Sequence, residues 1–332
     1  MPLPLAVTMG DPAGIGGELT LAAWQARRRA GQPFIVIDDP ARLAGLAKRL
    51  GIDVPIRETT PEGASSSFAD ALPVLPLDPL GAVTPGKSSL KHAAAAIEAI
   101  RLAVELSLAG RVGGLVTNPV YKKSLYDHGF AYPGQTEYVG ALSDPKAHPI
   151  MLLASPSLKV VPLTTHLPLR AAIDAVTTGA IITLGKLMAT ALAQDFGHDP
   201  VRLAIAGLNP HAGEEGKMGT EDEAIIRPAV DALKAAGVHA VGPLSPDSMF
   251  HEEARIHYDA ALCMYHDQAL IPLKTLDFRS GVNATLGLPV VRTSPDHGTA
   301  FDIAGQGKAD ISSFLAALDM AAAIAARRQA GR

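Results

Sequence analysis

Short apolar runs alternate with longer amphipathic segments along the chain. Strands that alternate with helices are typical of an α/β fold with a mostly parallel sheet, because each helix returns the chain to the edge where the next strand begins. We therefore predict an α/β protein. The runs predicted as strands are Leu5–Thr8, Phe34–Ile37, Gly114–Thr117, Ile150–Ala154, Lys159–Thr165, Arg202–Leu208, Ala261–Tyr265 and Pro289–Arg292.

The clearest amphipathic segment is a predicted helix from about Ser89 to Ala109. One face is apolar, and another carries charged side chains three and four positions apart, which stabilises a helix surface. Ser88 or Ser89 can cap its start, and Gly110 suits its end. The apolar face consists of Ile97, Ile100, Val104 and Leu108, and the charged face of Glu98, Arg101 and Glu105.

The chain has 332 residues, more than one compact core usually holds, so two domains are expected. Its character changes near Tyr132-Pro133-Gly134, and a return to the first domain near Pro289 is plausible. We therefore predict a discontinuous first domain, 1–131 with 290–332, and a second domain, 132–289. The segments predicted as loops are Thr59–Ser67, Pro73–Lys87 and Gly242–Asp247.

Charge and cysteine content narrow the class of protein. Lys+Arg 29 against Asp+Glu 33 gives a formal net charge of -4, so no basic face for nucleic acid is expected. The single cysteine, Cys263, lies in an apolar run and is predicted to be a buried core thiol in a reducing compartment. The alanine-rich stretch from Ala93 to Gly110 carries charges that do not suit a membrane span. We expect a cytoplasmic protein that binds no nucleic acid and no membrane.

Three histidines follow three predicted strands: His166 after Lys159–Thr165, His211 after Arg202–Leu208 and His266 after Ala261–Tyr265. The carboxyl ends of parallel strands form one edge of a sheet, where α/β proteins bind ligands. Three imidazoles at that edge suit a divalent metal, with zinc, cobalt, nickel or iron favoured over magnesium. The alternative is three unrelated histidines at strand ends.

Two carboxylates accompany these histidines. Asp267 is adjacent to His266, and Asp247 lies in Ser245-Pro246-Asp247-Ser248. Either could orient a ligating imidazole or accept a substrate proton. The alternative for Asp247 is an ordinary turn residue.

Two glycine-rich segments are candidates for anion or cofactor binding. Gly10–Glu18 lies between the first strand and a helix of about a dozen residues, but its spacing does not match a Rossmann loop. Near the C-terminus, Lys274, Asn283 and Arg292 surround a second glycine-rich stretch. Lys and Arg supply charge for a phosphate or carboxylate, and Asn supplies a neutral donor.

Several of these strings together resemble the 4-hydroxythreonine-4-phosphate dehydrogenase family over nearly the whole chain. More distantly, Gly10–Glu18 and His297–Gly305 are similar to segments of isocitrate and isopropylmalate dehydrogenases, which bind NAD(P) without a Rossmann domain. The strings that carry the family resemblance are Gly10–Gly16, Thr164–Leu169, Leu208–Gly213, Met264–Gln268, Gly281–Pro289 and Asp296–Gly305.

The resemblance implies a homodimer of two α/β/α domains of the isocitrate/isopropylmalate dehydrogenase-like type, with the active site in the inter-domain cleft at the dimer interface. The second domain would carry most metal ligands and the interface. His166, His211 and His266 match the ligands of one divalent metal, the last from the partner subunit, with zinc, cobalt or magnesium as alternatives. The matching substrate-binding positions are Gln135, Thr136, Lys274, Asn283 and Arg292, and the positions along NAD or NADP are His297, Gly298, Thr299, Ala300 and Asp302.

The activity implied by the resemblance is oxidation of 4-phosphooxy-L-threonine at its 3-hydroxyl by NAD(P), followed by decarboxylation to 3-amino-2-oxopropyl phosphate in pyridoxal phosphate synthesis. The chain departs from the family at Gln135, where the family commonly has histidine. The neutral amide of Gln135 is expected to hold an anion less tightly than a charged group would. Relatives that act on 4-phospho-D-erythronate or 4-phospho-D-threonate, or on cis-dihydrodiols, are therefore alternatives. A metal-dependent hydrolase is a further alternative that would need no dinucleotide.

Overall fold

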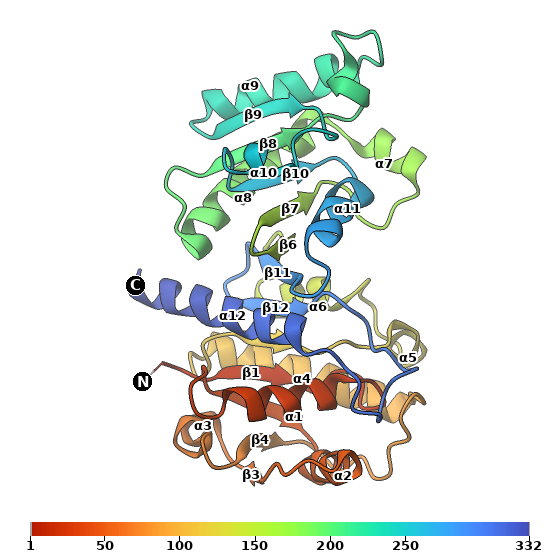
Figure 1. Cartoon of the computed structure of the whole chain (residues 1–332), viewed down its shortest axis with the longest axis vertical. Coiled ribbons are helices and arrows are strands. Elements are labelled where there is room, and N and C mark those ends of the chain that lie inside the picture. Colours follow the sequence, from red (N-terminus) through yellow and green to blue (C-terminus); the bar gives the residue numbers. More distant parts are fainter. Residues whose placement is uncertain (1, 332) are drawn as a thin grey trace. The chain divides into compact units, whose positions relative to one another are not determined.

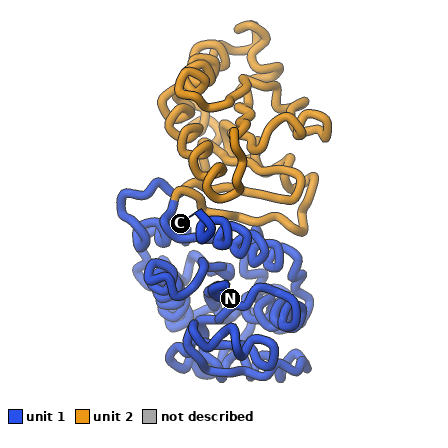
Figure 2. Tube along the Cα trace, turned by 90° about the vertical axis from the view of Figure 1, so that its left-hand side faces the viewer, with its two compact units in different colours: residues 1–149, 288–332 blue, residues 150–287 orange. Residues whose placement is uncertain are grey.

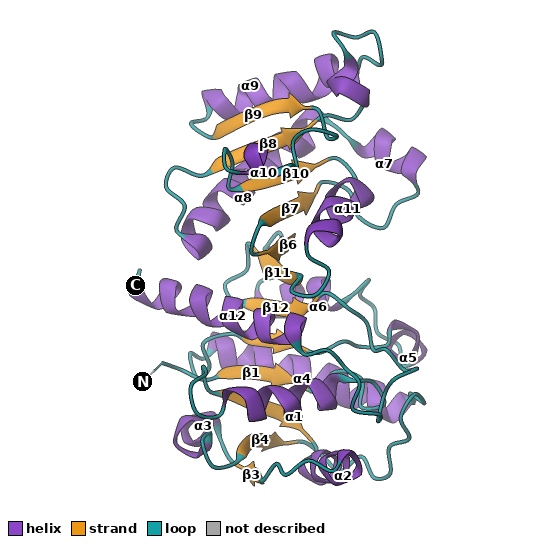
Figure 3. Ribbon diagram, in the orientation of Figure 1, coloured by secondary structure: helices purple, strands orange, loops and turns teal. Residues whose placement is uncertain are grey.

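The computed structural model describes residues 2–331 as a mixed α/β protein, which confirms the predicted class. The chain forms two compact units, residues 1–149 with 288–332 (unit 1) and residues 150–287 (unit 2) (Figure 2). Figure 3 shows that each unit combines strands with helices that cover them. Unit 1 is discontinuous in sequence, because the C-terminal segment adds a strand and a helix to it.

The first crossing between the units follows Pro149, beyond the sequence-based estimate near Tyr132. Helix α6 (Gln135–Ser143) belongs to unit 1, where the ring of Tyr138 packs against Phe130 and Tyr132 with centroid distances of 5.0 and 5.1 Å. This aromatic contact extends unit 1 past the Tyr-Pro-Gly turn. The second crossing, after Gly287, lies near the estimate at Pro289.

The sheet of unit 1 is parallel throughout, in the order β3-β4-β2-β1-β5-β12. Helices α1 and α12 lie on one face and α4 on the other (Figure 1). The strands are β1 (Leu5–Thr8), β2 (Phe34–Asp38), β3 (Ile56–Glu58), β4 (Leu72–Pro76), β5 (Leu115–Thr117) and β12 (Arg292–Pro295). The other helices are α1 (Gly16–Arg27), α2 (Pro40–Leu50), α3 (Pro61–Ser67), α4 (Leu90–Leu108), α5 (Lys122–Asp127) and α12 (Ser312–Ala330).

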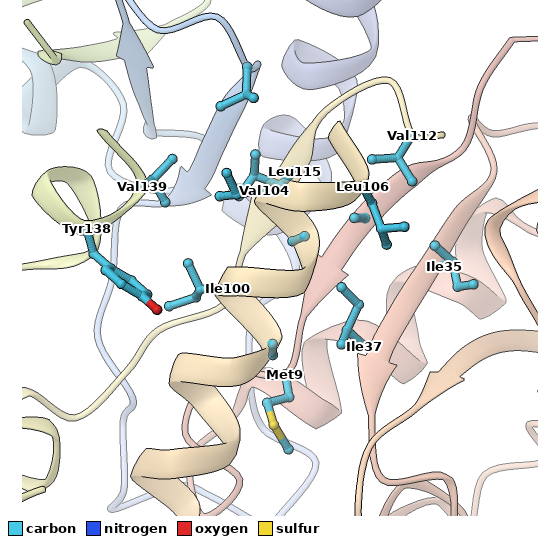
Figure 4. Close-up of a cluster of buried hydrophobic side chains, with 14 of the residues drawn as sticks. Met9, Ile35, Ile37, Ile100, Val104, Leu106, Val112, Leu115, Tyr138 and Val139 are labelled. Carbon is cyan, nitrogen blue, oxygen red and sulfur yellow. The ribbon is translucent and has the colours of Figure 1, made fainter. Parts of the chain in front are cut away.

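Helix α4 provides much of the core of unit 1 (Figure 4). Its predicted face is confirmed for Ile100 and Val104, each 1% exposed, but Leu108 is 49% exposed and was wrongly assigned. The rest of the buried face of α4 consists mainly of alanines, Ala93, Ala96, Ala99 and Ala103. Fewer large apolar side chains of this helix are therefore buried than predicted. Ser89 Oγ accepts a hydrogen bond from the backbone N–H of His92 at 3.3 Å, as expected for the cap. Arg101 pairs with Glu98 and Glu105 on the outer face, also as predicted.

The sheet of unit 2 is mixed, in the order β11-β6-β7-β10-β8-β9. Strand β6 pairs antiparallel with β11 and β7, while β7, β10, β8 and β9 are mutually parallel. The strands are β6 (Ile150–Ser155), β7 (Leu158–Pro162), β8 (Arg202–Ala206), β9 (His239–Leu244), β10 (Ala260–Cys263) and β11 (Val282–Leu286). The helices are α7 (Leu169–Ala175), α8 (Thr178–Phe196), α9 (Arg227–Ala235), α10 (Glu252–Arg255) and α11 (His266–Leu276).

Several local predictions were wrong. Thr59–Ser67 is not a loop, because Pro61 starts helix α3 and the buried Ala64 packs it against the sheet. Pro289–Arg292 is not a strand, because the chain bends after Gly287 at φ +76° and pairs only from Arg292 onward. Parts of the other two predicted loops form β4 and β9. Strands β4 and β9 contain proline and β3 has only three residues, so these strands lack the alternating pattern by which a strand is recognised. Strand β11 (Val-Asn-Ala-Thr-Leu) has that pattern and was overlooked.

Cys263 is fully buried, and burial raises the pKa of its thiol, which confirms the predicted core position. Within residues 2–331, no single helix is long and apolar enough to cross a membrane, and the one combination of adjacent helices that passes by composition, α7 with α8, is bent by 84°.

Candidate functional site

The three histidines singled out in the sequence follow three neighbouring parallel strands of unit 2. Strand β10 lies between β7 and β8, so all three strands end at one edge of the sheet. His166 follows β7, His266 follows β10 and His211 follows β8. The three histidines therefore follow strands that end at the same edge of the sheet, as the topology argument expected.

Two of these histidines have an unusual backbone conformation. His166 has φ +53° and His211 has φ +54°, in the left-handed region that non-glycine residues rarely adopt. His211 also begins a run of six residues, 211–216, that all have positive φ. Such strain persists only where surrounding contacts impose it, and it is concentrated at functional sites.

The structure brings His166 and His266 together. Their ring centroids lie 5.7 Å apart, and both residues line a pocket of about 370 Å³ in unit 2. Asp267 Oδ1 lies 2.7 Å from His266 Nδ1. A carboxylate at Nδ1 fixes the tautomer that leaves Nε2 to face a ligand.

His211 does not line that pocket, and within residues 2–331 no three His, Cys, Asp or Glu side chains form a metal-binding group. His211 instead lies near Asp247. A hydrogen bond from Ser245 lowers the pKa of the Asp247 carboxyl, and the charge of His211 acts in the same direction. Asp247 is thus ionised at neutral pH, and its Ser245 contact also fits the turn alternative.

The other candidate substrate residues of unit 2 lie on different elements. Lys274 is in the last turn of α11, with Nζ 5.5 Å from the ring centroid of Phe278. Asn283 lies on β11, half-buried, and its Oδ1 has no hydrogen-bond partner among the described residues. Both present polar groups suited to an anionic or hydroxylated ligand.

Unit 1 contains a buried guanidinium that is a candidate anion-binding group. Arg292, at the start of β12, is 4% exposed. It donates to Thr117 Oγ1 at 2.8 Å and to Thr136 Oγ1 at 3.2 Å. Burial lowers the pKa of Arg292 to about 10, while the charge of Glu137 acts in the opposite direction. A buried guanidinium has lost most of its hydration, so a bound anion would stabilise its charge.

Gln135 and Thr136 occupy the first turn of α6, where backbone N–H groups and the helix dipole also favour an anion. Gln135 Nε2 donates to the backbone carbonyl of Asn118 at 3.3 Å, and its Oε1 is buried without a partner among the described residues. Thr136, Arg292 and Gln135 therefore lie together in unit 1, as the resemblance implies.

Thr117 and Asn118 contact the candidate residues Arg292 and Gln135 and were not singled out in the sequence analysis. Asn118 is fully buried, donates to Thr8 O and Thr20 Oγ1 at 3.0 Å each, and lies against Gly10 and Gly16. A Cβ at Gly16 would approach Asn118 Cβ to 3.0 Å. The available signal was their position directly after the buried strand Leu115–Thr117, at the ligand-binding edge of a parallel sheet.

Two glycine-rich segments of unit 1, Gly10–Glu18 and His297–Gly307, are in contact. Ile15 N donates to Thr299 O at 3.1 Å, and Glu18 accepts from the backbone of Gly305 and, at 2.8 Å, of Gly307. Ala300 has φ +43°, and His297 Nε2 is buried without a partner among the described residues. A cavity of about 450 Å³, lined in part by Gly14, lies beside them. This volume is within the range of small-molecule sites.

The geometry can be compared with known proteins. A family model described as the pyridoxal phosphate biosynthetic protein PdxA matches residues 30–321. The chain belongs to the PdxA family. This family assignment confirms the resemblance drawn from the three histidine motifs and the three glycine-rich strings of the sequence.

PdxA relatives match the chain over its whole length. The 4-hydroxythreonine-4-phosphate dehydrogenase of Xanthobacter autotrophicus is 50% identical and aligns over 98% of this chain and 94% of its own. The one of Caulobacter vibrioides is 51% identical, with 98% of each chain covered. The crystal structure of 4-hydroxythreonine-4-phosphate dehydrogenase from Klebsiella pneumoniae superposes with a TM-score of 0.88 at 38% identity, covering 97% of this chain and 99% of that one.

Proposed function

We propose that this PdxA protein is a 4-hydroxythreonine-4-phosphate dehydrogenase. It oxidises 4-phosphooxy-L-threonine at the 3-hydroxyl with NAD(P), and the resulting 2-amino-3-oxo-4-phosphooxybutanoate loses carbon dioxide to give 3-amino-2-oxopropyl phosphate. The observation that carries the proposal is the placement of three histidines at the ends of three adjacent parallel strands, in a chain that matches enzymes of this name along its whole length.

His166, His211 and His266 would hold one divalent cation, with zinc favoured by the three imidazoles and cobalt or magnesium as alternatives. The donor set fits, because His166 and His266 line one pocket and the Asp267 carboxylate orients the His266 ring. When bound, such a cation polarises the substrate hydroxyl and the carbonyl that replaces it.

Arg292, Thr136 and the N-terminal turn of α6 would bind the phosphate or carboxylate of the substrate. A guanidinium that is buried among hydroxyl groups gains more from an incoming anion than an exposed one, because water does not screen the pair. Lys274, Asn283 and Gln135 would add donors and acceptors that fix the orientation of the substrate.

The contacting segments Gly10–Glu18 and His297–Gly305 would hold the dinucleotide, through His297, Gly298, Thr299, Ala300 and Asp302. Gly14 packs closely on Thr299: a Cβ at this position would lie 2.9 Å from the Thr299 carbonyl oxygen, so the contact between the two segments needs glycine. Residues 297–302 are therefore held in place, and a half-exposed glycine-rich backbone can approach a ligand closely.

Asp267 and Asp247 differ in the proton chemistry that they can perform. Asp267 contacts the ring of His266 and would orient that imidazole. Asp247 lies near His211 and is held ionised by its lowered pKa, so it can accept a hydrogen bond from a substrate hydroxyl and take up its proton only as that hydroxyl becomes more acidic.

We further propose a cytoplasmic homodimer in which His266 of the partner subunit completes the site. His211 does not line the pocket of His166 and His266 within one chain, so a second subunit would be needed to bring all three imidazoles to one cation. Further support comes from apolar side chains that unit 2 leaves exposed, among them Leu169 at 59%, Ile271 at 62% and Phe278 at 78%. Large apolar side chains that are exposed on α7, on α11 and just after α11 favour burial in a protein interface.

The dimer is expected to weaken when one of these side chains is charged. In the variant Phe278→Asp, dimer formation would bury a carboxylate, which costs free energy. The variant should therefore sediment as a monomer of 34.5 kDa and bind the metal more weakly, because the partner subunit no longer contributes a ligand. Val241→Asp on β9, also exposed (46%), is the control and should leave the mass unchanged. A monomeric wild-type protein with full activity would contradict the proposal.

The substrate can be tested with a panel. The purified, metal-replete protein is expected to form NADH or NADPH with 4-phosphooxy-L-threonine at a kcat/KM well above that with 4-phospho-D-erythronate or 4-phospho-D-threonate. Oxidation of one of the two sugar acids is the second candidate function. It is suggested by Gln135, whose neutral amide replaces a histidine that is common in the family. Turnover of a sugar acid alone would move the protein to a catabolic reaction with the same residues.

A further inference from the structure

The three strand ends that lead to the histidines are joined by side chains with no assigned role. Thr164 Oγ1 donates to the backbone carbonyl of Met264 at 2.9 Å, which links the segment after β7 to the segment after β10. Gln268 Oε1 accepts from Met264 N at 2.6 Å, and its Nε2 donates to Gly207 O at 2.7 Å. One hydrogen-bonded chain therefore crosses from β7 through β10 to β8, all within unit 2.

Gln268 is the centre of this chain. It lies in the first turn of α11, is 7% exposed, and donates to a backbone carbonyl 61 residues away in sequence. The carbonyl of Gly207 requires a donor and the N–H of Met264 requires an acceptor, so the orientation of the amide is determined. Removing this side chain would leave two backbone groups unpaired in a buried place.

Asp222 secures the segment that precedes His211. Its carboxylate is fully buried and accepts from Leu208 N at 2.8 Å, Asn209 N at 3.1 Å and Asn209 Nδ2 at 2.9 Å. A Cβ at Gly207 would lie 2.8 Å from Asp222 Oδ1, so the segment packs directly on this carboxylate. These contacts precede the left-handed run 211–216 and help to impose its strained conformation.

We propose that Gln268, together with Thr164 and Asp222, is a positioning residue that determines where the three imidazoles are presented to a divalent cation, in their own subunit or to its partner. This inference rests on the proposed function. Contacts behind metal ligands orient them and typically change metal affinity by roughly 10- to 100-fold when they are removed. A buried polar network whose members are all paired also holds one geometry rigidly.

The test uses the full-length protein with Co²⁺, whose visible absorption reports the coordination geometry, and Zn²⁺ affinity from competition with a chelator. Gln268→Met preserves length but not hydrogen bonding, and Thr164→Val removes the hydroxyl at constant shape. Each is expected to weaken Zn²⁺ binding about 10-fold and to change the Co²⁺ bands. Thr164→Ser, which keeps the hydroxyl, should restore both.

The matched control is Tyr258→Phe. Tyr258 is as buried as Thr164 and donates to a backbone carbonyl, Met249 O, at 2.8 Å, but it lies near the amino end of β10. It should lower the melting temperature with unchanged Co²⁺ bands. Unchanged affinity and bands in Gln268→Met and in Thr164→Val would overturn the positioning role alone. An unaltered protein without Co²⁺ bands would overturn the metal site as well.

Discussion

His211→Ala is expected to abolish bound zinc and to reduce kcat by roughly 10³-fold while the protein remains folded. Loss of one of three imidazole ligands removes the cation and with it several kcal/mol of transition-state stabilisation. The fold should persist because His211 is exposed and the neighbouring Ala212 already adopts the same left-handed conformation at φ +52°. Metal content by atomic emission, circular dichroism and turnover of 4-phosphooxy-L-threonine measure the three outcomes.

His239→Ala is the control for this variant. His239 is also exposed and belongs to unit 2, but it begins β9 and therefore lies at the amino edge of the same sheet. It should retain both zinc and turnover. A His211→Ala protein that keeps full activity after its metal has been removed would contradict the assignment of the histidines as ligands.

The second large effect is expected for Arg292→Met, with a KM for the phosphorylated substrate roughly 10- to 100-fold higher. The estimate corresponds to the loss of charge-assisted hydrogen bonds worth about 1.5–3 kcal/mol. The same variant should be as stable as the unaltered protein or more so without substrate. Burial lowers the pKa of Arg292 to about 10, which means that the fold disfavours the charged form relative to water.

Steady-state kinetics and a melting curve without substrate test both halves of this prediction. Arg202→Met provides the control, because Arg202 is 46% exposed and pairs with Asp259 at 2.8 Å in unit 2. It should leave the KM unchanged. An unaltered KM in Arg292→Met would remove Arg292 from the anion site, whereas a strongly lowered melting temperature would show that its role is structural.

The periodic elements could be predicted from the sequence, because their signal is local. Strand β1 has the bounds expected from its apolar run, and the capped helix α4 begins within a residue of the prediction. The misassigned Leu108 and the overlooked helix α3 depended on which surface packs against the sheet. Which surface of a helix packs against the sheet depends on residues far apart in the chain, so it cannot be predicted from a local sequence pattern.

The candidate site shows the same division. Histidine at the end of a buried strand is a local motif, so His166, His211 and His266 could be selected as candidates together. Asp222 and Gln268 carried no such signal, since one looks like a helix-surface acid and the other like a neighbour of His266. Their importance arises from hydrogen bonds to backbone groups 14 and 61 residues away.

The sequence by itself determined the α/β class, the family and the residue types available for chemistry. These could be recognised because the periodicity of strands and helices, and the motifs at strand ends, depend only on residues that are close in sequence. Only the tertiary structure decided that Arg292 is buried beside Thr117 and Thr136, that Glu18 holds the second glycine-rich segment, and that Gln268 joins two strand ends. Burial and hydrogen bonding between distant segments depend on the folded chain, and these contacts turn suitable residue types into a preorganised site.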